Sequence, residues 1–169
     1  MSRAQTGASQ AQSQDSPAWQ GSPAPQAGLA LYQRIRGYQR QADPRGLGYA
    51  VVDLETTGLE PQDEAIIEVG VVLLDPHGRE QLRWDSLVNP HRHPGPTRIH
   101  GITPDDLTDA PELGILAPAL VELLRGRVLV AHNIRFDASF LLPALRLELG
   151  TAALPRKIPQ VCTMNWARS

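Results

Sequence analysis

The sequence predicts one α/β domain built on a mixed β-sheet. Its 169 residues, of which 41% are hydrophobic and 20% are charged, suit a single globular core. After about residue 46, short runs rich in Val and Ile alternate with segments whose leucines recur at helical spacing. The order of these segments is three strands, helix, strand, helix, a short strand and the start of another helix, which is typical of a sheet that combines a hairpin with crossover connections.

The chain before this domain differs in composition. Residues 1–28 are almost entirely Ser, Ala, Gln, Gly and Pro, so we expect a disordered tail. A mitochondrial presequence is the alternative, but Arg3 is the only basic residue of the tail. Residues 29–45 predict a short helical arm packed on the domain or on a partner. The apolar face of this arm is formed by Leu31, Ile35 and Tyr38.

Three strands are expected at the start of the domain, which we place at residues 46–169. Residues 49–54 form a compact apolar run that ends at a Thr-Thr-Gly turn. Residues 65–75 are rich in Ile and Val and end at Pro-His-Gly, and residues 79–88 end at Asn-Pro. These last two segments predict an antiparallel hairpin.

Helical segments follow the three strands. Thr103 can cap a short turn after a Pro-rich loop. Leucines at helical spacing predict a helix over residues 111–125, and residues 136–149 predict a second long helix that Gly150 ends. Residues 127–131 between them predict a short buried strand. The last strand is expected near Val161.

Composition excludes some classes of protein. The sequence has no run of 18 or more apolar residues, so we predict no membrane-spanning segment. The lack of an apolar leader and the single Cys162, which can form no internal disulfide, predict a cytoplasmic location. The net charge of -2 argues against binding of nucleic acid through bulk positive charge, although a small cleft could still bind it.

The most informative segment is residues 51–59, Val-Val-Asp-Leu-Glu-Thr-Thr-Gly-Leu. Side chains two apart on a strand share a face, so Asp53 and Glu55 should project together. Like charges on one face destabilise a strand unless a cation compensates them, and Mg2+ and Mn2+ prefer oxygen ligands. The pair, with Thr56 and Thr57 as small donors beside it, therefore indicates metal-assisted phosphoryl chemistry. The alternative is that both carboxylates lie past the strand end and are simply solvated.

A second polar cluster occurs within residues 130–137, Val-Ala-His-Asn-Ile-Arg-Phe-Asp. A buried strand here ends in His132 and Asn133, and Asp137 falls in the first turn of the next helix. We expect this third carboxylate to reach the same cleft as the first two. Alternatively, Asp137 only stabilises the helix N-terminus, a contribution of about 0.3 to 2 kcal/mol.

Together, VVDLETTGL, AHNIRFDASFL and the intervening VNPHRHPGPTRIHGITPDDL resemble the DEDD exonuclease superfamily. They are most similar to the DnaQ-like 3′-to-5′ exonucleases, which include the epsilon proofreading subunit of bacterial DNA polymerase III. The resemblance covers roughly residues 48–169. It implies an RNase H-like fold, a mixed sheet flanked by helices. It also implies release of nucleoside 5′-monophosphates from a single-stranded 3′ end, with DNA as the expected substrate and DNA polymerase III subunits as candidate partners.

The resemblance also implies roles for individual residues. Asp53 would bridge two Mg2+ or Mn2+ ions, Glu55 would bind one of them, and Asp137 would contact the second through water. A metal-activated water would then attack the terminal phosphodiester. The residues expected around the terminal nucleotide are Glu55, Thr56, Thr57 and Leu59, with His100, Asn133 and Phe136 as neighbours.

One family motif has no counterpart in this sequence. The third motif, a His followed five positions later by an Asp on a C-terminal helix, should follow residues 161–168, and the chain stops at Ser169. The expectation is a fold that lacks its C-terminal helix and exposes the apolar surface on which that helix would pack. We then expect either a fragment with little or no activity or a protein completed by another chain.

Two other functions stay open at this point. One is an inactive module that binds a 3′ end or docks on a DNA polymerase through its helical arm. The other is an RNA-trimming exonuclease of the same family, which a preference for a 2′-hydroxyl would reveal.

Further candidates have simpler interpretations. His91 and His93 alternate as zinc ligands do, but without a third nearby ligand we favour a solvated loop. Cys162 follows an apolar residue and has no adjacent base, which favours a structural thiol over a nucleophile. Three arginines could meet a nucleic-acid backbone or serve only solubility. They are Arg92, Arg98 and Arg135.

Overall fold

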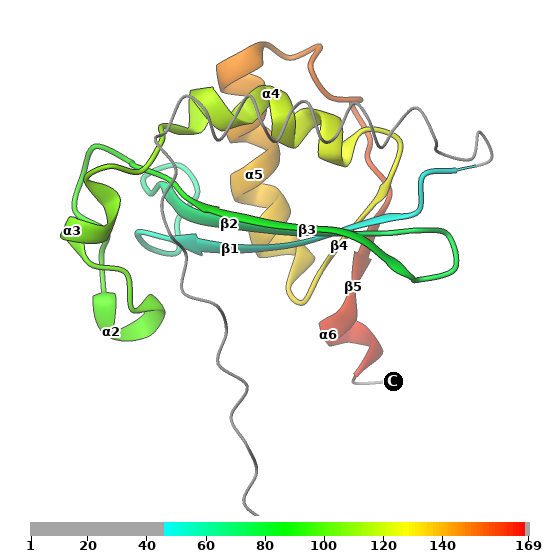
Figure 1. The fold of residues 1–169 in the computed structure, drawn as a ribbon, viewed down its shortest axis with the longest axis horizontal. Coiled ribbons are helices and arrows are strands. Elements are labelled where there is room, and N and C mark those ends of the chain that lie inside the picture. The colour runs from blue at the N-terminus through cyan, green and yellow to red at the C-terminus, as the bar shows by residue number, and fades with distance from the viewer. Residues whose placement is uncertain (1–45, 168–169) are drawn as a thin grey trace, which may run out of the picture.

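The computed structural model describes residues 46–167. The predicted tail, residues 1–28, and the predicted helical arm, residues 29–45, both lie outside the described residues. Figure 1 shows a mixed β-sheet with two long helices above it and short helices at its edges. This arrangement confirms the predicted α/β class with a mixed sheet and flanking helices.

The sheet has five strands in the order β3-β2-β1-β4-β5. The strands are β1 (Tyr49–Thr56), β2 (Ile66–Leu74), β3 (Glu80–Leu87), β4 (Val128–Ala131) and β5 (Gln160–Cys162). The antiparallel pairing of β2 with β3 confirms the predicted hairpin, and β1 pairs antiparallel with β2. β4 and β5 add to the other edge of β1 as parallel strands. Parallel neighbours need a crossover connection, which the long helices supply.

Five helices are described. They are α2 (Thr97–His100), α3 (Pro104–Leu107), α4 (Leu113–Leu124), α5 (Ile134–Leu149) and α6 (Thr163–Trp166). Both long helices occur close to their predicted positions: α4 begins two residues later than expected, and α5 begins two residues earlier. The short α2 was not predicted: it follows Pro96 and ends at Gly101, whose left-handed φ of 78° closes the turn. Among residues 46–167, no helix is both long and apolar enough to cross a membrane.

The core lies between the sheet and the pair α4 and α5 (Figure 1). Alternate residues of β1 point into it, namely Ala50, Val52 and Leu54, each at most 6% exposed. They pack with leucines of both helices, which are buried on the side that faces the sheet. Residues 51, 53 and 55 consequently face the opposite side of the sheet.

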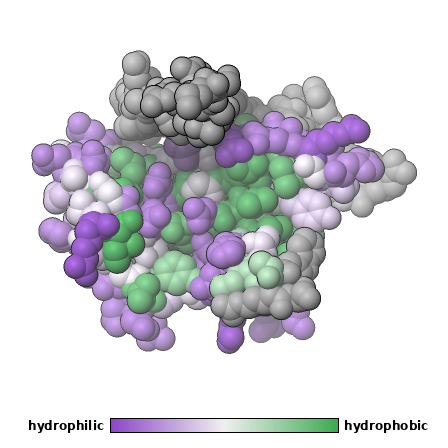
Figure 2. Space-filling model, turned by 90° about the horizontal axis from the view of Figure 1, so that it is seen from below, coloured by the Kyte–Doolittle hydropathy of each residue, from purple (hydrophilic) through white to green (hydrophobic). Residues whose placement is uncertain are grey.

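The opposite face of the sheet is apolar at its centre. Val51 lies between Val72 of β2 and Val130 of β4, and Val130 lies beside Val161 of β5. Figure 2, which views the molecule from this side, shows hydrophobic residues gathered in the middle of the face. The two long helices of the described region lie on the other face. Val51, Val72 and Val161 are partly exposed on this face, and Val130 is buried.

A smaller core fixes the connection between β3 and α4. Thr103 accepts a hydrogen bond from the backbone amide of Asp106, whose side chain in turn accepts from the Thr103 backbone amide. This capping box confirms the predicted cap and positions Leu107. Leu107 packs in a buried cluster with Ile102 and Ile67 of β2, which holds the α2–α3 segment against the end of the sheet.

Candidate active site

Strand β1 carries the first two predicted carboxylates on its outer face. Asp53 is exposed and Glu55 is partly exposed, and the strand continues beyond both to Thr56. The carboxylates therefore lie within the strand and not past its end. Asp53 is opposite Gly70 of β2, where an added Cβ would meet only the Asp53 backbone carbonyl, at 3.8 Å. The alternation of β1 thus brings two acidic side chains to one open surface.

Glu68 of β2 adds another carboxylate that the sequence analysis missed. It lies directly opposite Glu55 in the β1–β2 pair. Burial raises the pKa of Glu68, and the negative charges of Glu55, Asp85 and Asp53 raise it further. The signal in the sequence was the Glu that interrupts the apolar run Ile-Ile-Glu-Val-Gly-Val-Val. The importance of Glu68 depends on the register of the β1–β2 pair, which places it opposite Glu55.

Asp137 reaches this site from the first turn of α5. β1 and β4 pair only as far as Val51 and Val130, and beyond that point the Leu54 backbone amide donates a hydrogen bond to the Asp137 carboxylate. Asp137 is only 4% exposed. Burial is the largest cause that raises its pKa, to about 6. The negative charge of Asp53 also raises it, while the hydrogen bonds from the Asp137 and Leu54 amides and the charge of His132 lower it.

The structure therefore brings the two separate acidic motifs together. The effect of Asp53 on the Asp137 pKa reflects their proximity, and the Leu54 hydrogen bond ties α5 to the middle of β1. A capping role for Asp137 does not account for its contact with β1, because a cap bonds to its own helix. The helix places a carboxylate against the strand that bears the first motif.

The two threonines after Glu55 hold the β1–β2 loop. The Thr57 hydroxyl donates to the Glu64 carboxylate and accepts from the Ala65 amide at 3.0 Å. The Thr56 hydroxyl donates to the Gly58 carbonyl at 2.6 Å. Both threonines are buried, so their hydroxyls serve the loop in this structure. Leu59, by contrast, is 78% exposed at the tip of the same segment.

His100 lies at the end of α2 near Glu68, since its charge lowers the Glu68 pKa. Its Nδ1 accepts a hydrogen bond from the Ile102 amide at 3.1 Å, so in the neutral ring the proton resides on Nε2. That Nε2 is buried, and no described residue accepts its proton. His100 therefore offers an unused donor on the same side of the site as Glu68.

The other two residues predicted to lie near the terminal nucleotide, Asn133 and Phe136, are at the start of α5. Asn133 is the exposed N-cap residue, and its side chain makes no capping hydrogen bond. Phe136 is partly buried, with its ring 5.0 Å from that of Phe140. The exposed side-chain amide of Asn133 and the aromatic ring of Phe136 thus lie within about one helical turn of Asp137.

The carboxylate oxygens of this surface are the kind of ligand that a hard divalent cation prefers. Within residues 46–167, no three His, Cys, Asp or Glu side chains lie close enough together to hold an ion. However, the raised pKa values of Glu68 and Asp137 both result in part from neighbouring carboxylates. Such uncompensated negative charge is what an oxygen-preferring cation relieves.

Other residues considered from the sequence make structural contacts. His91 forms an ion pair with Glu112 at 2.9 Å, and His93 Nδ1 accepts from the Gly95 amide at 3.1 Å. The Cys162 thiol donates to the His132 carbonyl at 3.3 Å. Arg92 donates to the Asp63 carbonyl, which joins the Pro-rich loop to the β1–β2 loop. Arg98 and Arg135 are exposed.

Comparison with known proteins identifies the family. The RNase T exonuclease model matches residues 50–169. The chain is 36% identical over 103 residues to the DNA polymerase III subunit epsilon of Treponema pallidum, covering 60% of this chain and 47% of that protein. It is 41% identical over 96 residues to the PolC-type DNA polymerase III of Bacillus cereus, covering 55% of this chain and 7% of that protein. The chain thus spans less than half the length of these relatives.

Solved structures share the fold. Escherichia coli exonuclease I in complex with a dT13 oligonucleotide matches with a TM-score of 0.63 at 17% identity, over 71% of this chain and 28% of that one. Exonuclease I from Methylocaldum szegediense matches with a TM-score of 0.63 at 19% identity, over 71% of this chain and 28% of that one. These similarities confirm the RNase H-like fold that the two motifs implied. With its family model matched over most of the sequence, this chain belongs to the RNase T family of exonucleases.

Proposed function

We propose that this chain is a metal-dependent 3′–5′ exonuclease domain that acts on DNA and releases nucleoside 5′-monophosphates. The observation that carries the proposal is the meeting of Asp137 with β1 beside Asp53, at the open surface that also bears Glu55. Family membership supports the same reaction class. The relatives support DNA as the substrate, since two belong to DNA polymerase III and a structural neighbour was solved with dT13.

The three carboxylates have distinct places in this proposal. Asp53, which is exposed on this face, would hold Mg2+ or Mn2+ together with Glu55 and Asp137. Bound ions of this kind supply an activated water and offset the charge of the phosphate. Asp137 is the carboxylate most deeply buried, so the chain fixes it by packing and by the Leu54 amide while Asp53 stays open to substrate.

The side chains around the carboxylates would bind the terminal nucleotide. Leu59 is a large apolar side chain held in solvent, which suits packing against a base. Phe136 offers an aromatic surface and Asn133 offers a polar contact, while His100, whose Nε2 is buried, would contact the nucleotide only after its side chain turned outward. Thr56 and Thr57 would shape this pocket through the loop that their hydroxyls hold.

The same relatives suggest a binding partner and a cellular location for this chain. Both polymerase relatives are DNA polymerase III proteins, so we propose that a subunit of a replicative polymerase is the partner and that the chain acts in the cytoplasm. The partner would deliver a frayed single-stranded 3′ end to the open surface of β1.

The test is release of nucleotide from a 3′-labelled single-stranded oligonucleotide in the presence of Mn2+. We expect nucleoside monophosphate as the product, dependence on Mn2+, and loss of release in Asp53→Asn. The matched control is Asp109→Asn, because Asp109 is also exposed but lies between α3 and α4. Equal release by both variants would contradict the assignment of Asp53.

A parallel assay with an RNA oligonucleotide of the same sequence tests the substrate. Faster release from DNA supports the proposal, whereas a preference for RNA would identify an RNA-trimming enzyme. A folded chain that binds the oligonucleotide and releases nothing would identify a binding module instead.

A further inference from the structure

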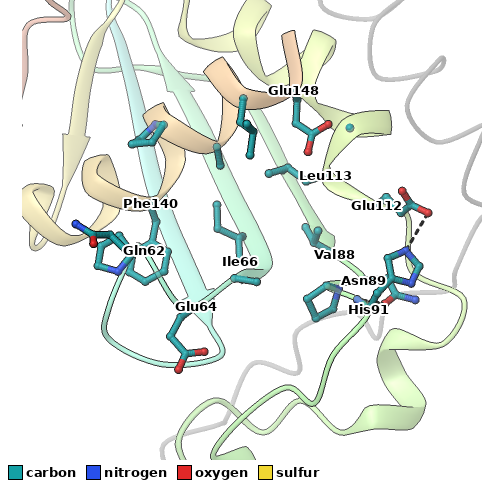
Figure 3. A pocket seen from close by; sticks show the side chains of 17 residues that line it. Gln62, Glu64, Ile66, Val88, Asn89, His91, Glu112, Leu113, Phe140 and Glu148 are labelled. Atoms are coloured by element: carbon teal, nitrogen blue, oxygen red, sulfur yellow. Dashed lines mark hydrogen bonds and ion pairs between the residues drawn. The ribbon is translucent and has the colours of Figure 1, made fainter. Parts of the chain in front are cut away.

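A groove of about 560 Å³ lies on the helix-covered side of the domain. Figure 3 shows that it is enclosed by the β1–β2 loop, the segment after β3, the start of α4 and one side of α5. Asp53, Glu55 and Asp137 do not line it. The interior is formed mainly by the apolar residues Ile66, Val88, Leu113, Phe140, Pro143 and Ala144.

One large apolar side chain stands in solvent at the rim of this groove. Leu147 of α5 lines the groove and is 85% exposed. An apolar groove continued by an exposed leucine is typical of an interaction surface. The occupant should therefore present an apolar stripe.

The rim of the groove is acidic. Glu64, Glu112 and Glu148 line it, and its lining contains no Lys or Arg. Glu148 lies against the first turn of α4: a Cβ on Gly114 would stand 2.7 Å from its Oε2, so the glycine permits this approach. His91 lies 2.9 Å from Glu112 and Arg92 pairs with Glu64 at 3.4 Å, whereas Glu148 has no ion-pair partner among the described residues. The occupant should therefore combine the apolar stripe with positive charge.

We propose that residues 29–41 of this same chain occupy the groove. Their sequence predicts an amphipathic helix, with Leu31, Ile35 and Tyr38 along one side. The segment has no acidic residue, and its charges are Arg34, Arg36 and Arg40. The apolar stripe matches the interior of the groove, and the arginines match its glutamate rim.

The tether between this segment and the domain is long enough. Residues 42–48 can span about 24 Å when extended, and a 13-residue helix is about 20 Å long. The strand β1, which begins at Tyr49, is about 26 Å long. The segment can therefore reach from the start of β1 to the groove near the other end of the sheet. This docking is independent of catalysis at Asp53.

Hydrogen exchange of the full chain tests the proposal. We expect the amides of residues 29–41 to exchange more slowly than in a free peptide of the same sequence. Leu147→Glu should abolish that protection, because it places a charge at the apolar rim. Ile99→Glu is the matched control, since Ile99 is 72% exposed on α2, away from the groove. Exchange as fast as in the free peptide, or protection that survives Leu147→Glu, would overturn the proposal.

A cross-link distinguishes this chain's own segment from that of a second copy. In a Cys162→Ser background, Ile35→Cys with Leu147→Cys should form a disulfide within the monomer, and Ile35→Cys with Ile99→Cys should not. Cross-linked dimers that increase with protein concentration would instead assign the groove to a second copy. The absence of any cross-link from the Leu147 pair, in a chain that is folded by circular dichroism, would refute docking.

Discussion

Glu55 and Glu68 lie directly opposite each other on the antiparallel strands β1 and β2. Like charges in this position repel, and the repulsion contributes to the raised pKa of Glu68. Asp53 and Asp85 add negative charge to the same surface. The domain therefore keeps an acidic surface that weakens its own sheet unless a cation or a proton compensates it.

The first prediction is that Mn2+ stabilises the folded domain through these carboxylates. Glu68→Gln should raise the metal-free stability by about 0.2–1 kcal/mol, because it removes one of two opposed charges. The same change should reduce the increase in Tm that Mn2+ produces. Thermal unfolding with and without Mn2+ measures both effects. Asp109→Asn serves as the control and should leave both quantities unchanged.

The second prediction concerns the pH dependence of stability without metal. The folded pKa of Asp137, about 6, lies above its ordinary value of 3.8, so the folded chain holds this proton more tightly than the unfolded chain. The contribution of Asp137 to the free energy of unfolding should be greatest below pH 4, and it should decline as the pH rises to about 6.

Urea denaturation between pH 4 and pH 7 measures this decline. Asp137→Asn should remove the Asp137 component, and saturating Mn2+ should reduce it because the cation favours the ionised carboxylate. An unchanged pH profile in Asp137→Asn would show that another group dominates in this range.

The third prediction concerns Gly95, which joins the Pro-rich loop to the candidate site. Gly95 has a φ of +87°, and a Cβ there would stand 2.1 Å from the Thr57 carbonyl oxygen. Gly95→Ala should therefore cost more than the roughly 1 kcal/mol of left-handed strain alone. Gly78→Ala is the matched control, because Gly78 has a similar φ of +81° and no atom within 4 Å of such a Cβ. Equal losses in urea denaturation would show that the loop moves away from Thr57.

The fourth prediction concerns the cap of α3. Thr103→Ala removes the acceptor for the Asp106 amide and should lower the free energy of unfolding by about 0.5–2 kcal/mol. The loss should also loosen Leu107 and the buried cluster under α3. Urea denaturation measures it, with Thr151→Ala, an exposed position outside any helix, as the comparison. A loss no greater than that of Thr151→Ala would contradict the capping role.

Local sequence patterns predicted most elements. A compact apolar run predicted β1, leucine spacing predicted α4, Gly150 marked the end of α5, and Thr103 marked the start of α3. These signals depend on residues within a few positions of one another, so they can be read along the chain. The α2 helix escaped prediction because one turn of helix has too few residues to show a period.

The sequence by itself determined that Asp53 and Glu55 share one face, because neighbouring side chains alternate along any strand. It also determined that Asp137 opens a helix after a buried strand. Only the tertiary structure decided that β1 pairs with β4 no further than Val51, which leaves the Leu54 amide to bind Asp137. Likewise, only strand register placed Glu68 opposite Glu55. The physical reason is that alternation is fixed by local backbone geometry, whereas strand neighbours and register are fixed by packing between residues far apart in the chain.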